Sequence, residues 1–191
     1  LVGSEMCIRD SVNINPSRIG IITILNKMGA TIKFKNKKIY NGEKIADIYV
    51  RSKKNLFSIN CPSKLNSSAI DEFLIIFLVA AKAKGVSRFK ELGEMNKKES
   101  KRLDLGIKFL KLIGIKVDRY KNNINIRGNP NLFLSDNFEM KDFLKDHRIF
   151  FLSCITALTL GGKWKINDKD SINSSFPSFL KILKNIGAKI N

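Results

Sequence analysis

The sequence has few of the residues that cross-link chains, bind metals or interrupt secondary structure. Its 191 residues include four prolines, one histidine, one tryptophan and three cysteines, Cys7, Cys61 and Cys154. An odd, widely spaced set of cysteines without a CxxC pair argues against a disulfide framework or a zinc site, and it predicts a reducing cytoplasm. Because no His, Cys and Asp cluster has metal-ligand spacing either, we expect no metal and no cofactor.

Long apolar runs are also scarce. The two longest, Phe73–Ala81 and Ile149–Leu160, fall short of the ~20 residues that cross a bilayer, so no membrane partner is expected. The chain starts without a charged segment followed by an apolar one, so no signal peptide is expected. At 43% hydrophobic residues, the chain suits one globular domain with a substantial core.

Acidic residues are half as numerous as basic ones, 17 against 35, which gives a formal charge of +18. Such an excess is typical of proteins that bind nucleic acid, anionic membranes or anionic substrates. It is also typical of AT-rich coding sequence, in which lysine, asparagine and isoleucine fill permissive surface positions. The lysines are scattered, and their densest patch, Lys33–Lys38, lies in a predicted hairpin. Charge alone therefore indicates no function.

The first eleven residues, 1–11, differ from the rest in composition and periodicity. The stretch Met6–Ser11 reads like a translated sequencing adapter joined to an incomplete reading frame. We therefore expect 1–11 to be a non-native segment and the native sequence to begin near Val12, and the fold prediction covers residues 12–191.

One pattern occurs three times, in Leu25–Ile32, Leu110–Val117 and Leu183–Ile190. Each copy joins the end of an amphipathic helix, a glycine that ends it, and the start of a strand. The copies recur about every 80 residues, which indicates an internal repeat.

A second helix–glycine–strand junction precedes two of the copies, at Gly85 and Gly161. The same offset puts the first unit's glycine near residues 1–3, so we expect that unit to be truncated. Alternating stretches such as Ala46–Arg51 and Asn123–Arg127 are predicted strands. The sequence thus predicts an α+β lobe with pseudo-threefold symmetry, with two helices and about four strands in each unit.

Three polar clusters lie at predicted helix starts: Ile70–Glu72, Lys98–Arg102 and Asp146–Arg148. A helix N-terminus attracts anions, whereas basic residues there oppose the helix dipole, so the basic clusters suggest a bound anion. Lys98 and Arg102, four residues apart, would share one helix face.

Simpler interpretations stay open for each cluster. Asp71 and Asp146 fall at equivalent positions of successive units, and either could be an ordinary N-cap. The Lys98–Arg102 run could be a solvated helix face, and a lone histidine such as His147 is more often structural than catalytic. The sequence contains no GxSxG, Walker or GxGxxG motif.

Several motifs in one order resemble the C-terminal half of the 5-enolpyruvylshikimate-3-phosphate synthase (3-phosphoshikimate 1-carboxyvinyltransferase) family, nearest its class II branch. The resemblance covers essentially all of residues 12–191. The motifs that carry it are Asn15–Gly20, Gly42–Ser52, Ile70–Glu72, Lys98–Arg102, Asp146–Ile149 and Ser175–Phe179.

The resemblance implies a fold and a reaction. The family has two lobes, each built from three βαβαββ units, with the active site in the cleft between them. This chain would then be a fragment, one lobe carrying half of the site. The reaction transfers the enolpyruvyl group of phosphoenolpyruvate to the 5-hydroxyl of shikimate 3-phosphate and releases phosphate, a step of the shikimate pathway.

The resemblance also implies roles for individual residues. Asp71 would contact the shikimate hydroxyls and accept a proton, and Lys98 would contact shikimate 3-phosphate. Glu99 would move a proton at the enolpyruvyl methylene. Three further residues would bind phosphoenolpyruvate: Arg102, His147 and Arg148.

The chain departs from the family pattern at several positions. Asn96 and Lys97 replace the usual Arg-Val, and Lys101 replaces an aspartate, where it could perturb Glu99 or point to solvent. Ser174 stands where some members have a phosphate-contacting lysine. Glu94 stands where some have a substrate-contacting asparagine, so we leave it out of the site.

Two other functions remain as alternatives. UDP-N-acetylglucosamine enolpyruvyl transferase shares the fold and the reaction type, but the Lys98–Arg102 and Asp146–Arg148 motifs favour the shikimate enzyme. A basic nucleic-acid-binding module would need a basic stripe interleaved with aromatics, which the sequence lacks, so no nucleic acid is expected. The expected partners are the two substrates and the missing N-terminal lobe, in a full-length monomer, and the isolated fragment should be inactive.

Overall fold

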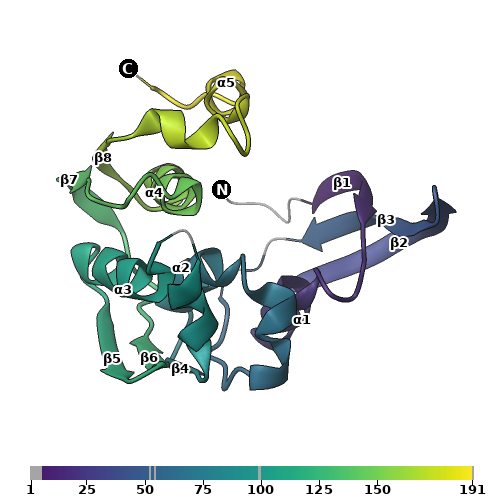
Figure 1. Cartoon of the computed structure of the whole chain (residues 1–191), viewed down its shortest axis with the longest axis horizontal. Helices are drawn as coiled ribbons and strands as arrows, with labels where there is room; N and C mark the ends of the chain where they lie inside the picture. Colours follow the sequence, from purple (N-terminus) through teal and green to yellow (C-terminus); the bar gives the residue numbers. More distant parts are fainter. Residues whose placement is uncertain (1–5, 52, 54, 99, 191) are drawn as a thin grey trace.

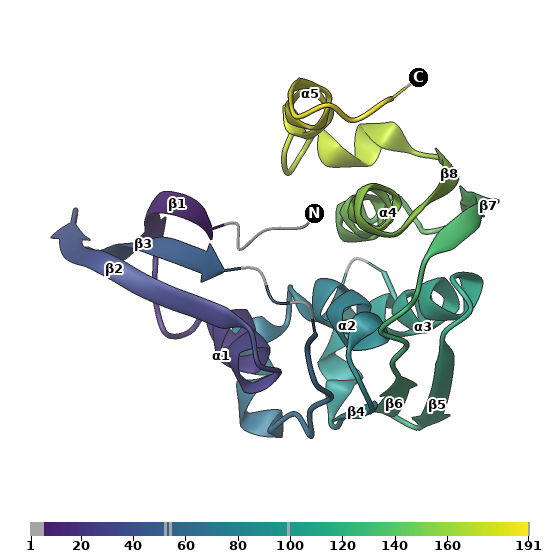
Figure 2. The same ribbon diagram turned by 180° about the vertical axis from the view of Figure 1, so that it is seen from behind.

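The computed structural model describes residues 6–51, 53, 55–98 and 100–190. Figures 1 and 2 show the chain from two opposite sides. The strands are β1 (Met6–Asn13), β2 (Thr31–Tyr40), β3 (Glu43–Arg51), β4 (Val86–Phe89), β5 (Lys116–Tyr120), β6 (Asn123–Arg127), β7 (Leu134–Met140) and β8 (Gly161–Ile166). The α-helices are α1 (Gly20–Lys27), α2 (Phe73–Lys82), α3 (Arg102–Leu112), α4 (His147–Leu160) and α5 (Phe179–Asn185). Four 3₁₀ helices connect them: η1 (Ser63–Leu65), η2 (Ser67–Ala69), η3 (Leu92–Lys97) and η4 (Lys169–Ile172).

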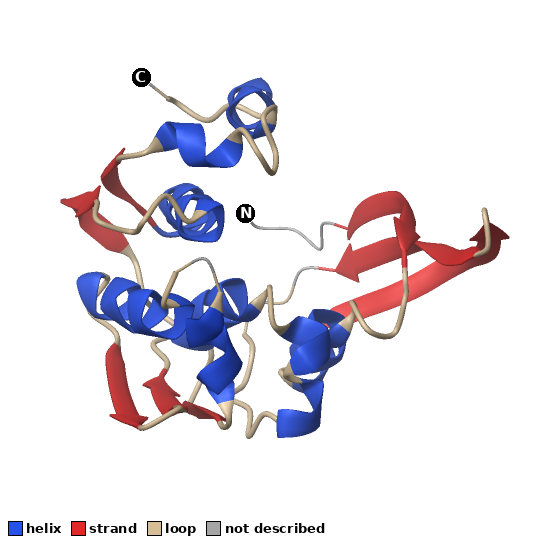
Figure 3. Ribbon diagram, viewed as in Figure 1, coloured by secondary structure: helices blue, strands red, loops and turns tan. Residues whose placement is uncertain are grey.

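Three small sheets lie around a group of helices, with sheet β1-β3-β2, sheet β4-β6-β5 and the pair β7-β8 on different sides of it (Figures 1 and 3). In the first two sheets a strand, a helix and an antiparallel hairpin follow one another, and the hairpin's second strand is central in both. The shared strand order confirms the predicted α+β repeat. In the third unit β7 and β8 pair in parallel, and α4 connects the end of β7 to the start of β8 along the chain. A parallel pair requires such a crossover connection.

The core centres on α2 and α4, which are the two longest apolar runs of the sequence. Seven of the ten residues of α2 are buried, and helices that are apolar all round belong in the interior. The aromatic rings of Phe73, Phe77 and Phe89 pack together, with centroids 5.3 to 6.0 Å apart. The polar residues that immediately precede α2 and α4 therefore stand on a rigid apolar base.

The repeat glycines have the backbone that the helix ends require. Gly29, Gly114 and Gly187 have φ values of 95°, 77° and 96°, and Gly85 and Gly161 have 105° and 89°. These angles are in the left-handed region, which glycine adopts without steric cost. The predicted helix ends are confirmed at all five glycines and the strand that follows is confirmed at four, whereas residues 188–190 after Gly187 form no strand.

Strand β1 is the main feature that the sequence analysis did not anticipate. Residues 6–9 of the expected non-native segment pair with β3, and the pairing resumes at Val12 after a register shift. Setting the segment aside hid the strand that corresponds to β4 in the second unit. That 1–11 is non-native stays a prediction, and the first-unit glycine expected near residues 1–3 lies outside the described residues.

The lysine patch Lys33–Lys38 lies in β2, and the hairpin that β2 forms with β3 is confirmed. Most of β2 is exposed, and one lysine, Lys35, lies over the ring of Tyr49 at 4.4 Å from its centroid. No helix in the described part of the chain is long and apolar enough to cross a membrane.

Candidate active site

Four cationic side chains surround the carboxylate of Asp71, which directly precedes the turn into α2. Arg102 and Lys98 lie 3.2 and 3.8 Å from Oδ1. Arg148 and Arg18 lie 3.4 and 3.6 Å from Oδ2. We call these five residues the Asp71 cluster. The structure thus brings together Asp71, Lys98, Arg102 and Arg148, all of which the sequence analysis had singled out.

Asp146 lies beneath this cluster and is fully buried. Its Oδ2 accepts hydrogen bonds from the Ser100 hydroxyl at 2.6 Å and from Nε of Arg102 at 2.9 Å. Its Oδ1 accepts from the backbone N–H of Arg148 at 2.9 Å, which makes it the N-cap of α4. The predicted capping role is confirmed for Asp146.

Asp71 has a different role from the one that simple capping predicts. The N-cap of α2 is Glu72, with no side-chain capping bond, and the Asp71 carboxylate points into the cluster of cations instead. Arg148 also donates from Nη1 to the backbone oxygen of Asp71 at 2.8 Å. The interpretation of Asp71 as an ordinary N-cap is therefore wrong.

The expectation that Lys98 and Arg102 share one helix face is also wrong. Helix α3 begins at Arg102, and Lys98 lies before it in extended backbone at the end of η3. The physical cause is Asn96, whose Oδ1 accepts from the backbone N–H groups of Leu103 and Asp104 at 3.0 and 3.4 Å and caps α3 from outside the helix. Lys98 and Arg102 meet at Asp71 through the fold.

The pKa values of two acidic residues near the cluster, Glu72 and Asp146, are shifted in opposite directions. Burial raises the pKa of Glu72, and Arg148 and Arg18 only partly offset that effect. Burial alone would also raise the pKa of Asp146, but the hydrogen bonds from Ser100 and Arg102 and the charge of Arg102 hold it below its usual value. Asp146 is thus stabilised as an anion beneath the site.

The remaining predicted residues have varied positions. His147 begins α4, and its ring packs on Phe151 with centroids 5.8 Å apart. Glu99 lies outside the described residues. Lys101 and Ser174 are exposed, and Glu94 accepts a hydrogen bond from Lys97 at 2.7 Å.

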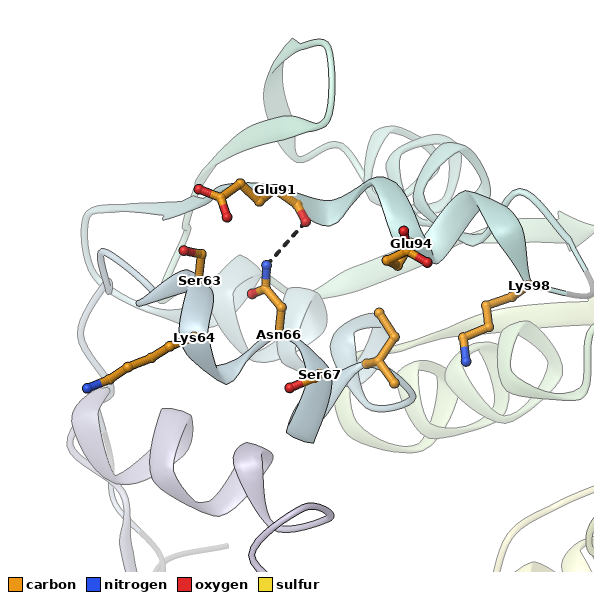
Figure 4. A pocket seen from close by; sticks show the side chains of 8 residues that line it. Ser63, Lys64, Asn66, Ser67, Glu91, Glu94 and Lys98 are labelled. Carbon is orange, nitrogen blue, oxygen red and sulfur yellow. Dashed lines mark hydrogen bonds between the residues drawn. The ribbon is translucent and has the colours of Figure 1, made fainter.

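A pocket of about 460 Å³ opens beside the cluster, on the side of Lys98 (Figure 4). It lies between the η1–η2 segment and η3, and Asn66 donates to the backbone oxygen of Glu91 across it. The residues that line it are Ser63, Lys64, Asn66, Ser67, Ile70, Glu91, Glu94 and Lys98. Over the described residues, no group of three or more His, Cys, Asp or Glu side chains could hold a metal ion.

Comparison with known proteins gives the class of this architecture. An EPSP synthase structure from Acinetobacter baumannii superposes with a TM-score of 0.89 at 31% identity, over 98% of this chain and 43% of that one. The enolpyruvyl transferase NikO from Streptomyces tendae gives 0.63 at 15% identity, which shows the fold alone. The lobe therefore has the enolpyruvyl transferase fold.

The sequence comparisons give the family. A family model described as EPSP synthase (3-phosphoshikimate 1-carboxyvinyltransferase) matches residues 2–183. Curated enzymes named 3-phosphoshikimate 1-carboxyvinyltransferase are 36% identical in Ruthia magnifica, over 94% of this chain, and 33% identical in Zymomonas mobilis, over 98%. The chain belongs to the EPSP synthase family. It spans about two fifths of the length of these relatives, 40% and 41%.

Arg18 is the member of the Asp71 cluster for which the sequence analysis gave no role. It lies in the motif Asn15–Gly20, which carried the resemblance without a function. Its contact with Asp71 joins residues far apart in the chain, so no local pattern could have revealed it.

Proposed function

We propose that this chain is the C-terminal lobe of an enzyme that transfers the enolpyruvyl group of phosphoenolpyruvate to the 5-hydroxyl of shikimate 3-phosphate. The observation that carries the proposal is the Asp71 cluster in a member of the EPSP synthase family. Both substrates are polyanions, and four cations around one carboxylate offset their mutual repulsion. The three free cysteines support a cytoplasmic location.

The roles follow from the chemistry of addition and elimination. The substrate hydroxyl attacks C2 of phosphoenolpyruvate as Asp71 accepts its proton, and Glu99 in its acid form donates a proton to C3. Phosphate then leaves as C3 loses a proton, with Glu99 as the group that moves it. Lys98 binds the phosphate of shikimate 3-phosphate.

Phosphoenolpyruvate lies at the arginines in this scheme. Arg148, with 29% of its side chain exposed, binds its planar carboxylate or phosphate through the guanidinium fork, and His147 donates a hydrogen bond beside it. Arg102, only 2% exposed, contributes its charge and holds Asp71 in place.

The site requires the opposite lobe, so the test is complementation. This chain is mixed with a separately expressed N-terminal lobe of the Ruthia magnifica relative, and phosphate release is followed with both substrates. We expect turnover only with both lobes. Asp71→Ala should abolish it, while Asp118→Ala, at an exposed strand position, should not.

Two results would contradict the proposal. One is phosphate release by this chain alone, because half of the site would then suffice. The other is the absence of turnover from two folded lobes whose association is verified by sedimentation. UDP-N-acetylglucosamine offered as the acceptor then tests the sister reaction.

A further inference from the structure

The motif Asn15–Gly20 links β1 to α1, and the function proposed above gives no individual role to any of its residues, although Arg18 is one of the four cations of the Asp71 cluster. Its backbone forms a tight turn in which the N–H of Arg18 donates to the carbonyl of Asn15 at 2.9 Å. Oδ1 of Asn15 accepts from the N–H and hydroxyl of Ser17 at 3.0 and 2.9 Å. Pro16 presets the backbone at the turn's second position. Local sequence therefore fixes the point from which the Arg18 side chain extends.

Gly20 brings this turn against the segment that leads to Asp71. A Cβ on Gly20 would lie 2.4 Å from Oγ of Ser68 and 2.7 Å from its backbone carbon, both closer than atoms can approach. Any side chain at position 20 would push α1 away from η2. The motif thus brings the first unit next to Asp71, which follows η2 by two residues.

Arg18 is the most exposed cation of the Asp71 cluster. Its side chain is 67% exposed, against 34% for Lys98, 29% for Arg148 and 2% for Arg102. With it, each of the three units contributes a cation to the same carboxylate. Its 3.6 Å ion pair with Asp71 is too exposed to add more than about 1 kcal/mol to stability. Stability alone is a weak reason for an arginine here.

We propose that Arg18 is a further substrate-binding residue of this site, which holds Asp71 from the side of the first unit and binds the phosphate of an anionic substrate. Four positive groups face three carboxylates, Asp71, Asp146 and the half-buried Glu72, so the described part of the site has an excess of positive charge. A guanidinium carries five N–H donors in a planar fork, and the contact with Asp71 involves one of its nitrogens. The exposed part of the fork suits a phosphate.

The inference rests on the proposed function and is tested in the complete enzyme, in which this chain is joined to the rest of its polypeptide. The variants are Arg18→Ala and Arg18→Lys, with Arg51→Ala as a matched exposed arginine on β3. The KM for each substrate, the kcat and the melting temperature are measured at two ionic strengths. Both substrates carry a phosphate, so the separate KM values show which one Arg18 binds.

We expect Arg18→Ala to raise the KM for one substrate about tenfold or more and to change kcat less than about threefold, as loss of a charged hydrogen bond predicts. Its KM should also depend less on salt, because one charge attraction is gone. Arg18→Lys should restore part of the affinity, because it keeps the charge and loses the fork. The melting temperature should stay unchanged.

Unchanged KM values for both substrates in Arg18→Ala would overturn the inference, as would an equal rise in Arg51→Ala. If Arg18→Ala does not fold, the comparison of Arg18→Lys with wild type decides, and equal KM values there would overturn it. Calorimetric binding of each substrate keeps the two proposals apart. A wild-type enzyme that binds both substrates without turnover contradicts the proposed reaction, while weaker binding by the Arg18 variants still supports the inference.

Discussion

Helices α2 and α4 begin at equivalent positions of successive units, yet the aspartates that precede them, Asp71 and Asp146, differ in burial and in their contacts. Asp146 is buried and accepts three hydrogen bonds of 2.6 to 2.9 Å from Ser100, Arg102 and Arg148. Asp71 keeps 15% of its side chain exposed, and its carboxylate contacts with cations are longer, 3.2 to 3.8 Å. The carboxylate of Asp146 is held by short hydrogen bonds, and that of Asp71 is held more loosely, as its proposed role as proton acceptor requires.

The comparison shows how a repeat acquires a site. Arg102 donates to both aspartates, to Asp146 from Nε and to Asp71 from Nη1 at 3.2 Å. Asp146 therefore fixes the arginine that in turn orients Asp71. Equivalence in the repeat predicts where two residues lie, and their neighbours determine what each does.

The largest effect that would sharpen this contrast is on activity. In the complete enzyme, we expect Asp71→Asn to lower kcat about 10²- to 10⁴-fold, because the amide cannot accept the hydroxyl proton. The urea midpoint should shift less than in Asp146→Asn. Steady-state kinetics and urea unfolding of both variants check the pair, and a larger midpoint shift in Asp71→Asn would reverse the assignment.

The second effect is on stability. Asp146→Asn should lower the free energy of unfolding by about 3 kcal/mol, because Arg102 loses the closer and more buried of the two carboxylates that compensate its charge. Asp136→Asn, on the exposed part of β7, should change it by less than about 0.5 kcal/mol. Equal urea midpoints for the two variants would show that the hydrogen bonds of Asp146 do not stabilise the folded lobe.

The hydrogen bonds and the ion pair of Asp146 also predict how stability responds to acid. The pKa of Asp146 is lower in the folded protein than in the unfolded chain. Its contribution to the free energy of unfolding is therefore complete when the pH is above the unfolded-state pKa, and it is lost as the pH falls through the folded-state pKa. Stability should therefore drop below about pH 4, where aspartate protonates in the unfolded chain. In Asp146→Asn, unfolding midpoints between pH 5 and 2.5 should fall less steeply than in wild type.

The smallest effect concerns the backbone before each helix. Asn66 and Ile70, before α2, have right-handed helical angles, whereas Leu144 and Lys145, just before Asp146, both have a φ of 55°. Non-glycine residues pay for that conformation, so Lys145→Gly should stabilise the protein by about 0.5 to 1 kcal/mol. Lys163→Gly, within β8, should destabilise it by a similar amount. Thermal unfolding distinguishes a gain from a loss.

The sequence predicts the parts of this structure that depend on neighbouring residues. The left-handed glycines after α1 and α3 and the apolar α2 follow from local pattern, and the structure confirms them. The start of α3 does not, because Asn96 caps it from six residues upstream. A run of charges at a predicted helix start cannot reveal that its first member lies outside the helix.

The features of the site that the sequence did not predict depend on contacts between residues far apart in the chain. The family resemblance named four residues of the Asp71 cluster, but Arg18 comes from a different unit and joins them only through the close approach of Gly20 to Ser68. The burial of Arg102 between two aspartates is equally invisible, because 31 and 44 residues separate it from its partners. The alternative that the Lys98–Arg102 run is a solvated helix face is wrong for Arg102, which is 2% exposed.

The buried Arg102 also limits how the lobe can come apart. It belongs to the second unit and Asp146 to the third, so opening either unit alone would break this buried ion pair, and opening the third unit would leave Arg102 with its 3.2 Å contact to Asp71. Opening one repeat at a time, as in an open solenoid, is therefore costly. We expect the amide protons of α3 and α4 to exchange with solvent in a single cooperative event, so that the lobe unfolds as one unit despite its threefold construction.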